Sequence, residues 1–146
     1  MYYKHLKSVL SKYGCNRILE DASKFEFINA PVDFYGISEV KGNIRNNERA
    51  EFEHMLLAEY LHHKIKVADN YNFPNKINGF DFEKVGSHFR LYKYSLGQFF
   101  RPHKDGHILD GELESQVTVL VYLNDTEAGE TVLMPNGPRL YLYSRK

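Results

Sequence analysis

The second half of the chain alternates aromatic or β-branched residues with polar ones, and this alternation restricts the fold more than any other feature. Gln116–Leu123 (Gln-Val-Thr-Val-Leu-Val-Tyr-Leu) is the strongest such run, and His88–Tyr94 alternates in the same way. Residues of these kinds fit the pleated surface of a sheet, and turn residues at Leu96-Gly97 and Asn124–Gly129 separate the runs. Further short strands are expected at Phe99–Asp105, Glu130–Met134 and Leu140–Tyr143, with a turn at Pro135–Pro138.

The first half of the chain predicts helices instead. Apolar residues from Leu6 to Tyr13 recur at helical spacing before Gly14, and Ala50–Val67 carries one apolar face that Asn46 or Asn47 could cap. Phe25–Phe34 is extended in character, and Asn70–Gly79 is rich in turn residues. Helices followed by antiparallel strands indicate an α+β, mainly β layout.

Length and composition exclude several classes of protein. The 146 residues predict one domain, 1–146, with enough length for a core. No apolar run is long enough for a membrane helix, and no signal peptide is expected. The net charge of zero gives no reason to expect a nucleic-acid partner. Cys15 is the only cysteine, which excludes an intrachain disulfide and weakly indicates a cytoplasmic location.

The pair His103 and Asp105 is the main chemical feature. Residues two apart in a strand point to the same side, so an imidazole and a carboxylate would lie next to each other. These are two of the three ligands in the facial triad of two histidines and one carboxylate that holds non-haem Fe(II). The spacing alone is weak, because two such residues also occur together on ordinary surface strands.

The neighbouring residues make the pair more specific. Arg90–Gly106 resembles the pattern R-x-Y-x-Y-x-x-G-Q-x-F-x-x-H-x-D-G of the prolyl-4-hydroxylase-like branch of the Fe(II)/2-oxoglutarate dioxygenases. Thr118–Asn124 resembles the T-x-L-x-Y-L-N strand of that branch, and Ala128–Thr131 resembles its G-G-E-T turn with alanine in the first place. Ile44–Arg49 is similar to the R-N-N-x-R element of a bacterial-type subgroup. The resemblance covers roughly residues 34–143.

This resemblance implies a double-stranded β-helix, or jelly roll, backed by the N-terminal helices. It implies that His103 and Asp105 are Fe(II) ligands and that Tyr94 and Tyr122 hydrogen-bond 2-oxoglutarate. The alternative for each tyrosine is core packing with an incidental hydrogen bond. The implied cofactors are Fe(II), 2-oxoglutarate as co-substrate, and ascorbate. The implied reaction hydroxylates a protein, prolyl residues included, or a small molecule, and releases succinate and CO2.

The sequence departs from the family pattern at its end. The family requires a distal histidine and then a basic residue for 2-oxoglutarate, but Pro135–Tyr143 resembles only the strand before them and the chain ends at Lys146. We therefore expect a truncated domain without its closing strands. His107 is a poor substitute ligand, because the third ligand should come from across the barrel. Arg139 is expected to be a solvated strand residue and not the basic residue that binds 2-oxoglutarate. His62 and His63 diverge by about 100° on a helix, so both cannot easily face one metal ion.

Two other functions stay open from the sequence. The chain could be an inactive remnant of the jelly roll that serves as a binding module, completed at its open edge by a partner strand or by a second copy. A cupin-type metal protein without 2-oxoglutarate fits less well, because Tyr94, Gly97-Gln98 and Asn124 match the dioxygenase pattern. Loops such as Ile108–Ser115 would select the substrate.

Overall fold

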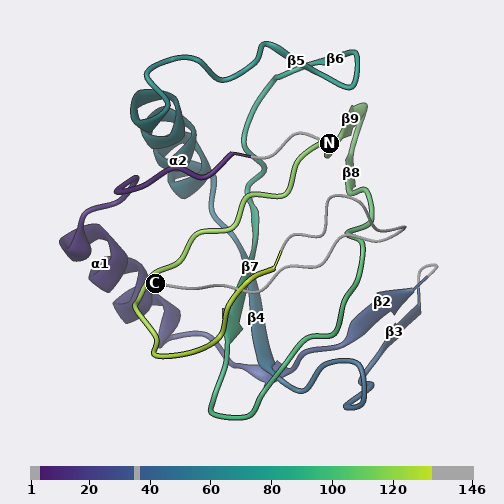
Figure 1. The fold of residues 1–146 in the computed structure, drawn as a ribbon. Coiled ribbons are helices and arrows are strands. Elements are labelled where there is room, and N and C mark those ends of the chain that lie inside the picture. Colours follow the sequence, from purple (N-terminus) through teal and green to yellow (C-terminus); the bar gives the residue numbers. More distant parts are fainter. Residues whose placement is uncertain (1–3, 35–36, 133–146) are drawn as a thin grey trace. The chain divides into compact units, whose positions relative to one another are not determined.

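The computed structural model describes residues 4–34 and 37–132 (Figure 1). The regular structure of these residues consists of two helices, one three-stranded sheet and three two-stranded sheets. The expected α+β class is therefore confirmed. The described residues form no closed barrel.

The chain divides into two compact units. The first unit contains Met1–Leu19, Glu53–Phe89 and Asp105–Leu123, and the second contains Glu20–Phe52, Arg90–Lys104 and Asn124–Lys146. Each unit is assembled from segments that lie far apart in the sequence. The expectation of a single domain over 1–146 stays a prediction.

Helix α1, Lys12–Ala22, starts where the sequence provides a cap. The Oγ atom of Ser11 accepts a hydrogen bond from the backbone N–H of Gly14 at 3.1 Å, as an N-cap serine does. The helix predicted over Leu6–Tyr13 with Gly14 as its stop is therefore wrong. Gly14 lies in the first turn of α1, where the Ser11 cap outweighs the low helix propensity of glycine.

Helix α2, Met55–Ala68, belongs to the first unit. His54 caps it, because its Nδ1 atom accepts a hydrogen bond from the N–H of Leu57 at 3.1 Å. The expected helix is confirmed in its body, but it was predicted to begin at Ala50 with an asparagine cap. Ala50 lies in a strand instead, since the preceding residues pair in a sheet. The buried residues of α2 share one face: Ala58, Leu61 and Ile65.

Two short hairpins complete the regular structure of the first unit. Strands β5, Lys76–Ile77, and β6, Phe80–Asp81, pair across Asn78 and Gly79, which have φ values of 54° and 88°. Glycine and asparagine adopt such angles most readily, so the predicted turn here is confirmed. Strands β8, Leu109–Asp110, and β9, Leu113–Glu114, form the second hairpin, within the segment expected to be a loop.

The second unit contains most of the three-stranded sheet, in the order β1-β4-β7. Strand β1 is Ile28–Asn29, β4 is Glu48–Glu53 and β7 is His88–Lys93. Figure 1 shows β4 and β7 side by side. A hairpin of β2, Val32–Phe34, and β3, Ile37–Glu39, also lies in this unit. The predictions of extended structure over residues 25–34 and 88–94 are confirmed in outline.

The strand predicted with most support, Gln116–Leu123, is not a strand in the structure. Its apolar side chains are largely exposed, with Val119 at 45% and Leu120 at 43%. Phe99–Asp105 likewise forms no strand and contains one isolated bridge, between Phe100 and Arg45. A β-rich sequence becomes a strand only when a partner satisfies its backbone, and among the described residues no neighbour does so for 116–123. Residues 130–132 of the strand expected at 130–134 do not form a strand, and the remainder of that segment, with 140–143, lies outside the described residues.

Candidate functional site

Two segments on which the resemblance was based, Ile44–Arg49 and the Gln98–Arg101 part of Arg90–Gly106, lie against each other in the second unit. The N–H of Asn46 donates to the carbonyl oxygen of Phe99 at 3.1 Å, and the N–H of Phe99 donates to Oδ1 of Asn46 at 2.7 Å. The N–H of Arg101 donates to the carbonyl oxygen of Ile44 at 2.8 Å. The R-N-N segment and the G-Q-x-F segment are more than 50 residues apart, as the Asn46–Phe99 separation of 53 shows. Their pairing places the two motifs in one site.

The turn before Phe99 is stabilised by the side chain of Gln98, a residue of the turn itself. The N–H of Ser95 donates to Oε1 of Gln98 at 2.7 Å, and the N–H of Gln98 donates to the carbonyl oxygen of Ser95 at 3.0 Å. Gly97 has a φ of 79°, an angle that residues with a Cβ atom rarely adopt. Gly97 therefore supplies the backbone angle of the turn, and Gln98 supplies the side chain that closes it. The turn predicted at Leu96-Gly97 is confirmed.

Arg45 lies at the centre of this pairing and is 3% exposed. Its guanidinium carbon is 3.9 Å from the ring centroid of Phe100 and 4.8 Å from that of Tyr92. Its Nε atom donates to Oδ1 of Asn47 at 3.0 Å, and Asn47 is fully buried. The cation is thus held against two aromatic faces, an arrangement that stabilises it by about 1 kcal/mol for each well-placed ring.

His103 stacks on the ring of Phe100 that also contacts Arg45. The two ring centroids are 3.7 Å apart with an interplanar angle of 17°. The Nδ1 atom of His103 lies 2.9 Å from the carbonyl oxygen of Arg101. A carbonyl only accepts, so this contact requires the proton on Nδ1 and leaves the lone pair of the neutral ring on Nε2. Metal-binding histidines are commonly oriented by such a contact.

Asp105, the other expected ligand, belongs to the first unit, whereas His103 belongs to the second. The Oδ2 atom of Asp105 accepts a hydrogen bond from Oγ1 of Thr118 at 2.6 Å. The described residues include no group of three or more His, Cys, Asp or Glu side chains that could hold a metal ion. They therefore do not form a complete three-ligand iron site by themselves.

The expected 2-oxoglutarate ligands are both substantially exposed. Tyr94 is 49% exposed in the second unit, and Tyr122 is 55% exposed in the first. Tyr122 was expected in the strand Gln116–Leu123, but residues 116–123 form no strand. The alternative of core packing fits neither exposure.

The other histidines with a possible metal role have local partners. The Nδ1 atom of His107 is 3.0 Å from Oε1 of Glu114 and 3.3 Å from the carbonyl oxygen of Ser115, across the β8–β9 hairpin. His62 stacks on Phe82 with centroids 5.1 Å apart. Burial lowers the pKa of His62, and the charges of Lys66 and His63 lower it further. Arg139 lies outside the described residues.

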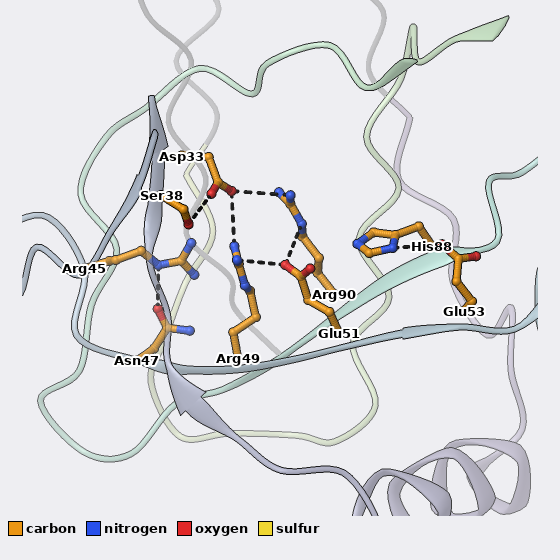
Figure 2. A network of polar contacts seen from close by, with 9 residues as sticks. All are labelled: Asp33, Ser38, Arg45, Asn47, Arg49, Glu51, Glu53, His88 and Arg90. Carbon is orange, nitrogen blue, oxygen red and sulfur yellow. Dashed lines mark hydrogen bonds and ion pairs between the residues drawn. The ribbon is translucent and has the colours of Figure 1, made fainter. Parts of the chain in front are cut away.

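A group of alternating positive and negative side chains lies along strand β4 in the second unit (Figure 2). Nη1 of Arg49 is 3.3 Å from Oδ2 of Asp33, and Nη2 of Arg49 is 2.8 Å from Oε1 of Glu51. Arg90 contacts the same two carboxylate oxygens, at 3.4 Å from Asp33 and 3.2 Å from Glu51. Two guanidinium groups thus share two carboxylates, and their charges balance. We call these four residues the charge ring.

The pKa of Asp33 is lowered in this arrangement. Burial alone would raise it, but the hydrogen bond from Ser38 and the charges of Arg49 and Arg90 lower it below the ordinary value of 3.8. In the first unit, Glu53 accepts a hydrogen bond from Ser87 at 2.8 Å and lies 2.9 Å from His88. The Ser87 hydrogen bond is the main reason that the pKa of Glu53 is lowered.

Sequence reasoning quoted Arg45, Arg49 and Arg90 only as letters of motifs and gave them no role. For Arg49 and Arg90, the available signal is their place in strand-like segments, with Arg49 two residues before Glu51, because opposite charges on neighbouring strands form ion pairs. The burial of Arg45 has no comparable signal in the sequence.

Comparison with family models, with curated protein sequences and with solved structures gave no match for this chain. None of the helices in the described residues has the length and apolar character needed to cross a membrane.

Proposed function

We propose that this chain is an Fe(II)- and 2-oxoglutarate-dependent dioxygenase of the prolyl-4-hydroxylase-like branch, with a jelly-roll fold. In this proposal His103 and Asp105 are iron ligands, and Tyr94 and Tyr122 bind 2-oxoglutarate. The reaction consumes 2-oxoglutarate and O2 and gives succinate, CO2 and a hydroxylated protein or small molecule, with ascorbate as the reductant that maintains Fe(II). The proposal requires a third ligand in addition to these two.

One observation supports this proposal most strongly. His103 lies within the segment Arg90–Gly106 that resembles the family pattern. The Arg101 carbonyl orients the His103 ring so that Nε2 carries the lone pair. Stacking on Phe100 fixes the plane of the ring. An iron ligand needs both conditions, because the metal selects the deprotonated nitrogen and a defined direction.

The first test is succinate release from 2-oxoglutarate with Fe(II), ascorbate and O2, without a prime substrate. We expect turnover by the unmodified chain that is lost in Asp105→Ala and in His103→Ala. Asp125→Ala is the matched control, because Asp125 is an exposed carboxylate with no assigned role. Equal succinate release by all four proteins, or none from the unmodified chain, would contradict the proposal.

A second function has its own supporting observation. In the part of the chain that the structure describes, residues 116–123 combine strong β propensity with exposed apolar side chains and form no strand. Such a segment can add a strand from a partner or from a second copy, which suits the alternative of a binding module without catalysis. Hydrogen exchange of the Val119 and Val121 amides at increasing protein concentration tests pairing with a second copy, because only pairing between molecules gives protection that rises with concentration.

A further inference from the structure

Arg45 differs from the other buried arginine of the second unit in having no carboxylate partner. Arg45 is 3% exposed and Arg49 is 6% exposed, so both guanidinium groups are removed from water. Arg49 is paired with Asp33 and Glu51. Among the described residues, no aspartate or glutamate lies within ion-pair distance of Arg45, and its Nη2 atom is buried without a hydrogen-bond partner.

The undescribed residues offer no acidic side chain to complete the pair. All 19 aspartate and glutamate residues of the chain fall within residues 4–34 and 37–132. The nearest carboxylates along the strand, those of Asp33 and Glu51, are already shared by Arg49 and Arg90. A buried guanidinium cannot lose its charge, and leaving it unpaired is costly. An external anion is therefore the partner that the composition leaves for Arg45.

The contacts of Arg45 define how such an anion would bind. The guanidinium carbon of Arg45 lies over the rings of Tyr92 and Phe100, and Nε donates its hydrogen bond to Asn47. The end that carries Nη2 is the part whose hydrogen-bonding capacity is unused. A ligand at this end would lie in the guanidinium plane, which is the geometry of a carboxylate facing an arginine.

We propose that Arg45 binds the carboxylate of a small organic acid. The charge count favours a monoanionic group, because one guanidinium is unpaired while those of Arg49 and Arg90 are already balanced. A dianionic phosphate would need a second cation. The inference does not depend on the proposed iron site, because neither His103 nor Asp105 contributes a contact. If the dioxygenase proposal is correct, 2-oxoglutarate is one acid with a suitable group.

Calorimetric titration of the full chain tests this proposal. The protein is freed of metal over a chelating resin, kept in a buffer without carboxylates, and titrated with acetate, succinate, 2-oxoglutarate and inorganic phosphate. We expect at least one of the three carboxylic acids to bind at millimolar or lower concentration, more tightly than phosphate. Arg45→Gln should weaken that binding by about tenfold or more, and Arg45→Lys should weaken it less, because lysine keeps the charge without the planar fork.

The matched control is Arg17→Gln, which removes an exposed arginine of α1 and should leave the affinity unchanged. A measurement on the unmodified chain protects the test against a variant that fails to fold. In ¹H–¹⁵N spectra of arginine side chains, the Nε–H signal of Arg45 should shift on addition of the acid more than that of Arg17.

Four results would overturn the inference: no carboxylate binding at millimolar concentration, equal binding in Arg45→Gln, equal affinity for phosphate, or no selective shift of the Arg45 signal. The two proposals fail in different ways. Metal-free binding that requires Arg45, without succinate release in the assay above, would refute only the dioxygenase. Succinate release that does not depend on Arg45, with no metal-free binding, would refute only the carboxylate site.

Discussion

The charge ring and the surroundings of Arg45 accommodate a buried guanidinium in opposite ways. In the charge ring, two arginines share Asp33 and Glu51, so every buried charge has a partner. Arg45 instead contacts Tyr92, Phe100 and Asn47, which attract the cation but do not neutralise it. The first arrangement balances the charge of Arg49 within the chain, although Nε of Arg49 is buried without a hydrogen-bond partner. The second stabilises the position of the cation while leaving one of its nitrogens available, which is expected of a binding residue rather than a structural one.

The largest expected effect separates the two arginines directly. Arg49→Met removes the cation shared by Asp33 and Glu51, and we expect it to lower the free energy of unfolding by about 2 kcal/mol. The loss should fall below the roughly 3–5 kcal/mol of a fully buried pair, because the Asp33 side chain is 43% exposed. Arg45→Met removes a buried charge with no carboxylate partner, so the change should stay within about 1 kcal/mol. Urea denaturation of the ligand-free proteins measures both, and equal losses would remove the distinction between the regions.

The next effect concerns the ring that joins Arg45 to His103. Phe100→Leu keeps an apolar side chain but removes the aromatic face, and we expect a loss of about 1 kcal/mol in the free energy of unfolding. The ring protons of His103 should also move downfield, because the shielding by the stacked phenyl ring is lost. Phe99→Leu is the control, since Phe99 contacts neither group through its ring in the described contacts. Unchanged His103 signals in Phe100→Leu would show that the stack is not populated in solution.

The same contrast explains which parts of the structure the sequence could predict. The turn at Gly97-Gln98 and the body of α2 depend on contacts within a few residues, so local spacing was sufficient for both. The strand at 116–123 requires a partner from elsewhere in the chain, and β propensity carries no information about whether one is present. Ala50 was assigned to a helix because its apolar neighbours fit helical spacing, but pairing of β4 in the sheet decided its conformation.

The candidate site follows the same rule. His103 was identified from its spacing to Asp105, and the Arg101 carbonyl that orients it is only two residues away. The burial of Arg45 depends instead on Phe100 and Tyr92, which approach it through the pairing of two segments distant in sequence. A motif can indicate that such residues belong together, but the absence of a carboxylate beside Arg45 becomes visible only in three dimensions.

A smaller effect is expected from the protonation of Asp33. The pKa of Asp33 is lower in the folded protein than its ordinary value of 3.8, so its contribution to stability is present above that value and is lost as the pH falls through the lowered one. Asp33→Asn and Arg49→Met should both reduce this acid-dependent loss, whereas Arg45→Met should retain it. Urea midpoints between about pH 5 and about pH 2 measure the slope. Asp125→Asn serves as the carboxylate control, and a flat profile in Arg45→Met would show that the two regions share their charges.

The smallest effect concerns a third basic side chain, that of His62 in the first unit, which stacks on the ring of Phe82. Burial against Phe82 and the charges of Lys66 and His63 lower its pKa below the ordinary 6.5, so the folded protein binds this proton more weakly than the unfolded chain does. Stability should therefore fall as the pH drops below 6.5, and His62→Gln should reduce that fall.

Urea midpoints measured from about pH 7.5 to about pH 5 provide the comparison, with the exposed His5→Gln as control. An unchanged slope in His62→Gln would mean that the ring is solvated in both states. If the slope does change, His62 shows how an imidazole escapes an unfavourable environment by releasing its proton. A guanidinium has no such option, because an arginine side chain cannot be deprotonated in a protein. Since neither deprotonation nor an internal carboxylate is available to Arg45, a bound carboxylate is the means left to balance its charge.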